Sequence, residues 1–257
     1  MTRSADISTE TVQDGRTQDV QIADALINDI IDWRHAPGSW IREREVAQRF
    51  GVSHAPVREA FRHVAREGFV VVVPWRGVRV VEIDVATAED VFELWKSMFS
   101  SIARLAAQRM TAAEHIELMR LLESYERSVE ITADPHVNTG LAYAVGRCIA
   151  EGARAPVVDE NLQRVGRLAL WQHGFLSAEE LERKLREPGR ESARRLRDLC
   201  GALVGRDSNA AARHAYDFLS VSQTYIVAEI AKRRAAAEQA TPETAKPRKR
   251  VKAGATG

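Results

Sequence analysis

Apolar positions recur at helical spacing near the start of the chain. Ile22, Leu26 and Ile30 lie four residues apart, which predicts an amphipathic helix over residues 19–34. Pro37-Gly38 follows, and this dipeptide is typical of a turn. The first regular element is therefore expected to end before residue 37.

Two shorter helical patterns come next, at residues 43–50 and from Ser53 to Gly68. Gly51 lies between them and suits a helix C-terminus, where a left-handed backbone costs glycine little. Ser53 is suited to cap the second helix, and Pro56 lies in its first turn, where a missing N–H removes no hydrogen bond. The pattern predicts two helices joined by a tight turn.

β-branched residues dominate the following segment, at 69–73 and again at 78–83, with Pro74-Trp75-Arg76-Gly77 between them. Two such runs around a short turn predict a β-hairpin. A helix, a helix-turn-helix and a hairpin in this order predict a winged helix-turn-helix over residues 18–84.

The remainder of the chain has helical patterns without strand signals, and Thr111 and Ser177 each begin a capping box. We therefore expect a mostly α protein, in which the winged helix-turn-helix is followed by an all-α antiparallel helical bundle over residues 85–232. Residues 1–17 are expected to be a disordered arm and 233–257 a disordered basic tail. The helices are expected at 87–110, from 112 onward, and at 137–151, 155–172, 177–186, 189–204 and 208–232.

The formal net charge is +1 over 257 residues, which excludes a protein that coats nucleic acid through its overall charge. Cys148 and Cys200 stand alone without a metal-binding motif, so neither a disulfide framework nor a zinc site is expected. The polar start and the lack of a long apolar run predict a cytoplasmic, nucleoid-associated protein without a membrane partner.

Positive charge is nevertheless concentrated locally. Residues 34–79 contain nine arginines and no lysine, against four glutamates and no aspartate, an excess of five positive charges. Arg58, Arg62 and Arg66 recur every four residues, away from the apolar side of their helix. A helix fits the major groove, and arginine binds guanine or phosphate. The alternative is a solvated face paired with neighbours such as Glu59, but the surrounding helix-turn-helix favours DNA.

A long, ordered set of motifs resembles the DNA-binding domain of the GntR family. Its segments are Pro37-Gly38, Arg42-Glu43-Arg44-Glu45-Val46-Ala47, Gly51-Val52-Ser53-His54-Ala55-Pro56-Val57-Arg58-Glu59-Ala60, Glu67-Gly68-Phe69-Val70 and Arg76-Gly77-Val78. The resemblance implies a homodimer that reads a short palindromic operator in double-stranded DNA.

The residues expected near DNA come partly from this resemblance and partly from the helix face and hairpin tip. They are Arg44, Ser53, His54, Ala55, Pro56, Arg58, Arg62, Arg76 and Gly77. After the serine the family usually has Arg and then Thr, whereas this chain has His54 and Ala55. The operator is therefore expected to differ from the family's usual one.

Residues 85–232 resemble the FCD effector domain of the FadR-like subfamily of this family. Many such domains hold a divalent metal with one Asp and three His. Neighbouring landmarks place Ala142, Gly146, Leu196 and Phe218 at those four positions, and none of these side chains offers a lone pair to a metal. We therefore expect no metal and no other cofactor.

Trp95 and Phe99 stand where related domains often have Arg and Glu, and the missing arginine argues against a carboxylate ligand. Two interpretations remain open. The six substituted positions line an apolar cavity for a hydrophobic or aromatic effector, or they fill the cavity as core. These positions are Trp95, Phe99, Ala142, Gly146, Leu196 and Phe218.

The sequence supports three classes of function unequally. The favoured one is a sequence-specific transcription regulator, expected to act as a repressor whose dimer geometry an effector selects. The second is a constitutive or architectural DNA binder whose C-terminal domain only dimerises. An enzyme is disfavoured because the sequence contains no nucleophile elbow, phosphate loop, metal signature or paired-carboxylate motif.

Overall fold

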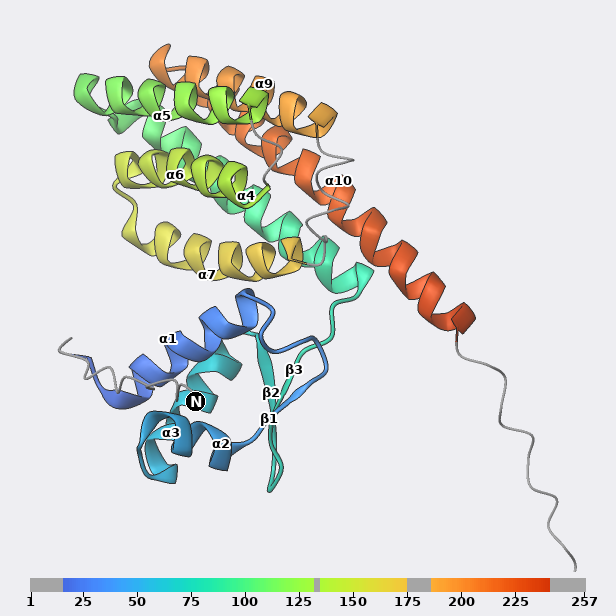
Figure 1. Cartoon of the computed structure of the whole chain (residues 1–257). Coiled ribbons are helices and arrows are strands. Elements are labelled where there is room, and N and C mark those ends of the chain that lie inside the picture. Colours follow the sequence, from blue (N-terminus) through green and yellow to red (C-terminus); the bar gives the residue numbers. More distant parts are fainter. Residues whose placement is uncertain (1–15, 132–134, 175–185, 241–257) are drawn as a thin grey trace, which may run out of the picture. The chain divides into compact units, whose positions relative to one another are not determined.

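A computed structural model describes residues 16–131, 135–174 and 186–240 (Figure 1). The chain divides into two compact units. Unit 1 comprises residues 1–83 and 156–174, and unit 2 comprises residues 84–155 and 175–257. Each is described separately below.

Unit 1 contains the predicted winged helix-turn-helix. Helix α1 (Gln18–Ile31) is followed by α2 (Glu43–Phe50) and α3 (His54–Arg66). Strands β1 (Trp40–Ile41), β2 (Val70–Val73) and β3 (Gly77–Val80) form an antiparallel sheet in the order β1-β3-β2. The sequence did not predict β1, because a two-residue strand is too short to show an alternating pattern.

The apolar stripes found in the sequence form the core of this unit. Ile22, Leu26 and Ile30 of α1 are buried, and α1 packs against α3. The buried side of α3 is the one expected from its spacing, with Val57, Ala60, Phe61 and Val64. Burying one large aliphatic or aromatic side chain stabilises a fold by about 1.5–3 kcal/mol, so this contact fixes the orientation of α3.

The turns differ in detail from the expectation. Gly51 has φ +64° and ends α2, as predicted. Ser53 has extended backbone at the start of α3, but its side chain makes no capping hydrogen bond. Helix α1 ends at Ile31 and not at Arg34, because Trp33 adopts φ +60°, outside the helical region.

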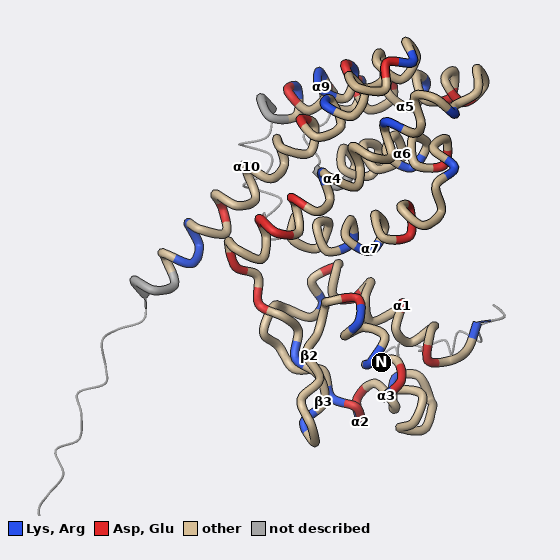
Figure 2. Tube along the Cα trace, turned by 180° about the vertical axis from the view of Figure 1, so that it is seen from behind, with Lys and Arg blue, Asp and Glu red and all other residues tan. Residues whose placement is uncertain are grey.

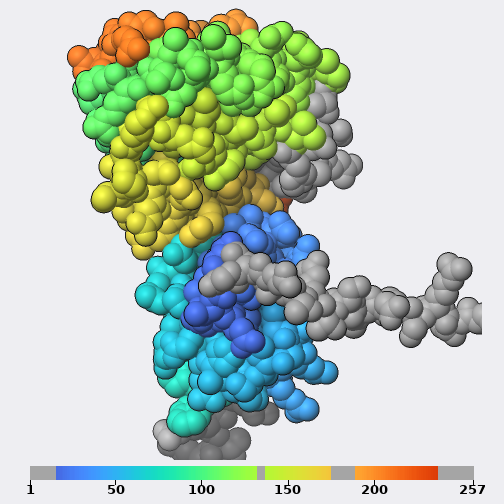
Figure 3. Space-filling view, turned by 90° about the vertical axis from the view of Figure 1, so that its left-hand side faces the viewer, coloured from blue at the N-terminus to red at the C-terminus, as the bar shows by residue number. Residues whose placement is uncertain are grey.

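Helix α7 (Pro156–His173) belongs to unit 1, although we expected it within the C-terminal bundle. It packs against α1 (Figure 3). The ring of Trp171 lies 5.8 Å from that of Phe69. The indole N–H of Trp33 donates to the carbonyl of Trp171 at 3.0 Å. The apolar spacing of α7 predicted a helix correctly, but it carries no information about which surface that helix covers.

Unit 2 is helical throughout its described residues. It contains α4 (Val85–Arg109), α5 (Ala112–Ile131), α6 (Pro135–Ala153), α9 (Arg186–Val204) and α10 (Ser208–Ala240). α4 packs against α6, α9 and α10, and α5 packs against α6 and α9. Only residues 205–207 separate α9 from α10, and these two helices pack against each other, as neighbours in an antiparallel bundle do.

Side-chain hydrogen bonds determine where two helices of unit 2 begin. Thr111 and Glu114 form the predicted capping box, since the N–H of Thr111 donates to the Glu114 carboxylate (2.7 Å) and the N–H of Glu114 donates to the Thr111 hydroxyl (3.3 Å). α4 begins at Val85 and not at Thr87, because the Asp84 carboxylate accepts from the Thr87 N–H at 2.8 Å.

The expected limits of the C-terminal segments also need revision. α10 continues to Ala240, so residues 233–240 are helical where we expected the start of the tail. Residues 241–257, almost all of the helix expected at 177–186, and all but the last two residues of the arm expected at 1–17 lie outside the described residues. Among the described helices, none combines the length and apolar character that crossing a bilayer requires.

Candidate nucleic-acid interface

Helix α3 has one buried face and one exposed face, and the predicted DNA-binding residues occupy the exposed one. Ser53, His54, Ala55, Arg58 and Arg62 are exposed, and Pro56 is half-buried. The opposite face is held in the core of unit 1. The first two turns of α3 therefore present their polar side chains to solvent on a helix whose orientation is fixed.

The hairpin tip presents the other predicted positions. Arg76 is exposed, and its N–H donates to the carbonyl of Val73 at 3.1 Å, which closes a tight turn. Gly77 has φ +103°, and a Cβ placed there would lie 2.5 Å from the carbonyl oxygen of Ile41. Only glycine fits this position, since it allows β1 to approach the base of the turn.

Glu43 connects the start of α2 to the exposed face of α3. Its Oε1 accepts from Nε of Arg58 at 2.9 Å and lies 2.8 Å from Nδ1 of His54. The Glu43 side chain is 27% exposed, whereas those of Arg58 and His54 are 62% and 53% exposed. Among the described residues only Nε of Arg58 is engaged, so both terminal nitrogens of its guanidinium are available there for a ligand. Sequence analysis did not identify this role for Glu43, since the pair is 15 residues apart.

Most other arginines of this region are ion-paired. Arg62 pairs with Glu59, Arg79 pairs with Glu82, and the buried Asp29 binds both Arg34 and Arg49. In Figure 2 the basic and acidic positions of unit 1 lie next to one another. Within the described part of the chain, the exposed Arg44 and Arg76 make no ion pair, so their charge is available to an anionic partner.

The C-terminal end of α3 is held by a polar chain. Arg66 donates to Nδ1 of His63 (2.8 Å), so Nε2 of His63 carries a proton and donates to Asp19 (3.1 Å). Hydrogen bonds from the side chain of Thr17 and from His63 keep the pKa of Asp19 below its ordinary value. Arg66, unlike Arg58 and Arg62, therefore has a structural role at the end of its helix.

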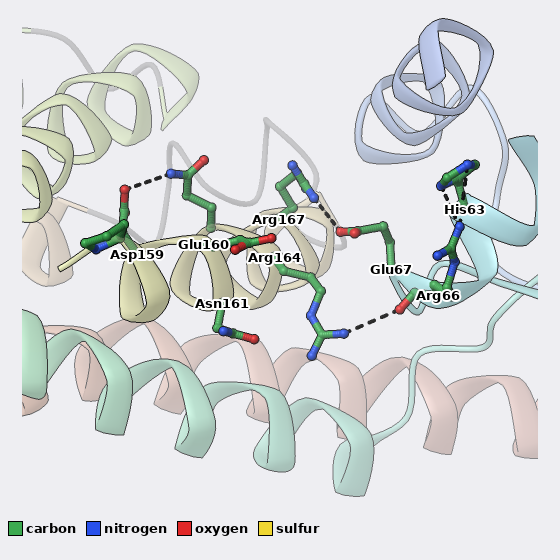
Figure 4. Close-up of a pocket in the computed structure, with 10 residues that line it drawn as sticks. His63, Arg66, Glu67, Asp159, Glu160, Asn161, Arg164 and Arg167 are labelled. Carbon is green, nitrogen blue, oxygen red and sulfur yellow. Dashed lines mark hydrogen bonds and ion pairs between the residues drawn. The ribbon is translucent and has the colours of Figure 1, made fainter. Parts of the chain in front are cut away.

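A cavity of about 650 Å³ adjoins this end of α3, within unit 1 (Figure 4). His63, Arg66 and Glu67 line it on one side, and charged and amide side chains of α7 line the other. Arg167 of α7 pairs with Glu67, and Arg164 donates to the backbone carbonyl of Arg66 at 3.5 Å. These contacts attach α7 to the helix that carries the predicted DNA-binding residues.

The six predicted effector-pocket residues lie on four helices of unit 2. Trp95 and Phe99 are on α4, Ala142 and Gly146 on α6, Leu196 on α9 and Phe218 on α10. Leu196 and Phe99 are 0% and 5% exposed, and the Phe99 ring reaches within 4.0 Å of the Cβ position of Gly146. The other four residues are half-buried, and Trp95 packs on Phe92 with ring centres 5.8 Å apart. Phe99 and Leu196 thus belong to the core of the bundle.

A polar cluster around the buried Lys96 of unit 2 is not signalled by the sequence. Lys96 is only 4% exposed, and its ammonium lies 2.8 Å from Glu93 and 3.0 Å from the hydroxyl of Tyr216. Burial opposes its charge, but the hydrogen bonds to Glu93 and Tyr216 outweigh that effect, so the pKa of Lys96 is raised. Lys96 therefore stays charged and joins α4 to α10. No local pattern signals it, because Tyr216 is 120 residues away.

Within residues 16–131, 135–174 and 186–240, no three His, Cys, Asp or Glu side chains gather closely enough to hold a metal ion.

The architecture matches solved structures over most of the chain. The Escherichia coli protein McbR/YncC aligns with a TM-score of 0.67 and 17% identity, over 85% of this chain and 99% of that protein. A putative GntR transcriptional regulator from Rhodococcus sp. RHA1 aligns with a TM-score of 0.62 and 17% identity, over 83% and 99% of the two chains. At this identity the likeness establishes the fold, a winged helix-turn-helix followed by a helical domain.

Sequence relatives match less than half of the chain. The HTH-type transcriptional repressor RspR of Escherichia coli (strain K12) is 34% identical over 110 residues, which is 43% of this chain and 48% of the relative. The Nta operon transcriptional regulator of Aminobacter aminovorans is 33% identical over 103 residues, 40% of this chain and 49% of the relative. The aligned part thus spans about half the length of these curated relatives, and they are named as regulators, not as enzymes.

The family comparison matches the N-terminal part of the chain. Residues 18–80 match the family described as bacterial regulatory proteins, gntR family. The match covers α1 to β3, including the exposed face of α3 and the hairpin tip. Residues 18–80 of this chain are therefore a helix-turn-helix domain of the gntR family.

Proposed function

We propose that this protein is a sequence-specific transcription regulator that binds double-stranded DNA through unit 1. The observation that carries the proposal is the exposed face of α3, where His54, Ala55, Arg58 and Arg62 project from a helix fixed by its buried side. A helix of this kind enters the major groove with its N-terminal residues against the base edges. The gntR family match of the same residues supports it.

In this mode Arg58 offers its two terminal nitrogens to the O6 and N7 atoms of a guanine. Arg44 and Arg76 have no ion pair within the described chain, and each can bind a phosphate. Ala55 has only a methyl group, which suits contact with the methyl group of a thymine. The side chain of His54 supplies a hydrogen-bond donor beside it.

The regulator acts as a homodimer on a palindromic operator and represses the genes that it controls. A palindrome follows when two copies related by a two-fold axis each insert one α3. The helical unit 2 supplies the dimer contacts, as expected for an FCD-type domain. Repression is supported by the function stated in the name of RspR. A protein bound to chromosomal operators is also located at the nucleoid.

An apolar or aromatic effector that needs no metal is the proposed signal. Ala142, Gly146, Trp95 and Phe218 are half-buried on three helices of unit 2 and would contact such a molecule. A second candidate function is constitutive DNA binding, with unit 2 serving only as a dimer module. Its support is the burial of Phe99 and Leu196, which already fill part of the core.

The test is selection of fragmented DNA from the source organism by the purified full chain, followed by sequencing of the retained fragments. The Arg58→Ala variant is run beside it. Arg127→Ala is the matched control, because Arg127 is an exposed, ion-paired arginine of unit 2. We expect one palindromic motif with the wild type and the control, and none with Arg58→Ala. Equal retention without a motif by all three proteins would refute sequence-specific binding.

The two candidate functions are separated by a second measurement on the operator so found. Compounds suggested by the flanking genes are titrated into the protein–operator complex. A compound that shifts the operator affinity and the Tm of the free protein supports effector control. A series that leaves both unchanged supports the constitutive binder.

A further inference from the structure

Trp75, at the tip of the β2–β3 hairpin, differs from the other tryptophans of this protein. Its side chain is 102% exposed, and its backbone is in the left-handed region at φ +65°. The Trp33 N–H is bonded to the Trp171 carbonyl, and Trp171 and Trp95 pack on phenylalanine rings. A large apolar ring held fully in water at the end of a rigid turn gains nothing from the fold of its own chain.

Backbone contacts hold the turn that carries Trp75. The Arg76 N–H closes the turn on Val73, and β3 is paired on both sides, to β1 and to β2. The absence of a Cβ at Gly77 lets the Ile41 carbonyl approach the base of the tip. The tip is thus a narrow wedge that carries an aromatic ring beside an arginine, and this arginine has no ion pair among the described residues.

We propose that Trp75 is a DNA wedge that enters the minor groove of the operator and inserts its ring against a base step, with Arg76 on the adjoining phosphates or groove wall. The inference rests on the proposed function of unit 1. The minor groove is about 6 Å wide, too narrow for a helix but open to a hairpin tip. Proteins that bind there commonly insert apolar side chains between base pairs, together with arginine.

The charge beside the ring favours DNA over a protein partner. Arg76 is exposed next to Trp75, and it makes no ion pair among the described residues. Insertion unstacks a base step, so the wedge favours flexible pyrimidine–purine steps at the flank of each half-site. Trp75 would therefore determine sequence preference at positions that α3 does not reach.

The experiment uses the full chain with Trp75→Ala and Trp75→Phe, and with Trp40→Phe as the matched control. Trp40 is also a partly exposed tryptophan of the sheet, at 40% exposure. Affinity for the selected operator is measured at several salt concentrations, and tryptophan emission is followed during the titration. Removing an aromatic ring that stacks on one base lowers affinity roughly 5- to 150-fold.

We expect Trp75→Ala to weaken operator binding within that range, with an unchanged salt slope because no charge is lost. Trp75→Phe should retain part of the affinity, and Trp40→Phe nearly all of it. DNA should quench the emission of the wild type and of Trp40→Phe, and should leave that of Trp75→Phe nearly unchanged.

Three other results would overturn the inference. If Trp75→Ala binds the operator with wild-type affinity while Arg58→Ala loses binding, the wedge role of Trp75 is refuted and the proposed function stands. A smaller assembly of Trp75→Ala in sedimentation without DNA assigns the ring to a contact between copies of the chain. Failure of the wild type to bind any DNA motif refutes the proposed function and this inference with it.

Discussion

Replacing Glu43 with glutamine tests whether the recognition surface is organised before DNA arrives. The Glu43 carboxylate holds Nε of Arg58 at 2.9 Å and Nδ1 of His54 at 2.8 Å. Both partners are more than half exposed, so the ion pairs themselves contribute at most about 1 kcal/mol to stability. Their effect on binding is larger, because fixing a flexible side chain during association costs about 0.5–1.5 kcal/mol. Losing this preorganisation from Arg58 predicts roughly 2- to 10-fold weaker operator binding.

Glu43→Gln also removes a negative charge close to the proposed DNA surface. That change alone strengthens binding to any sequence, because less repulsion acts on the phosphates. The two effects separate when the operator is compared with a shuffled duplex at the same salt concentration. Operator affinity should fall while shuffled-duplex affinity stays constant or rises, so the ratio of the two Kd values narrows. Fluorescence anisotropy with labelled duplexes measures both.

The matched control for this experiment is Glu59→Gln. Glu59 pairs with Arg62 on the same helix, so the change in charge is the same, while the contact between α2 and α3 is untouched. Equal effects of the two variants would show that Glu43 acts through charge alone. Tighter, fully selective operator binding by Glu43→Gln would show that Glu43 competes with DNA for Arg58, and the preorganisation argument would be refuted.

Three further predictions concern stability and reactivity. Gly77→Ala should lower the free energy of unfolding, measured by urea titration, by about 1–3 kcal/mol through backbone strain and contact with the β1 carbonyl. Gly51 also has positive φ but open space around it, so Gly51→Ala should lower the free energy of unfolding by less. A hydrogen bond from the Thr111 N–H lowers the pKa of Glu114 from 4.5 to about 2. The stability lost in Glu114→Gln should therefore be constant above about pH 4.5 and vanish toward pH 2, as measured in acid titrations followed by circular dichroism. A difference in stability that persists at pH 2 contradicts the assignment. Burial raises the pKa of Cys200 to about 12. Peptide mapping should therefore find Cys200 unmodified by iodoacetamide at pH 8 until urea unfolds the chain. Rapid modification of the native protein would show that the region around Cys200 opens.

The fold of unit 1 was predictable because its signals are local. The four-residue spacing of Ile22, Leu26 and Ile30, the glycine at position 51 and the β-branched runs each act within a few residues, and each produced the expected element. The side of α3 that faces solvent followed from the same spacing. The exposed position of Arg58 and Arg62 was therefore implied by the apolar residues on the opposite side.

The contacts that orient side chains on this surface depend on the tertiary structure. Glu43 reaches Arg58 only because the turn at Gly51 folds α2 back beside α3. The amphipathic pattern of α7 fits any apolar surface, so the packing of Trp171 on Phe69 could not be inferred from it. Trp75 appeared only as a turn residue, because a sequence pattern does not distinguish a tip that is covered from one that is bare.

The ion pairs change the meaning of the local charge excess. Nine arginines and four glutamates between residues 34 and 79 suggest a broad basic surface, but Asp29, outside that interval, neutralises part of it by binding Arg34 and Arg49. Each arginine held by a carboxylate releases fewer counterions on binding DNA than an unpaired one would. Under the proposed function, unit 1 would discriminate between DNA sequences through a few directed contacts, made by side chains such as Arg58, which Glu43 orients. Such a surface gives up non-specific affinity for selectivity, which suits a regulator that must find a few operators among many competing sites.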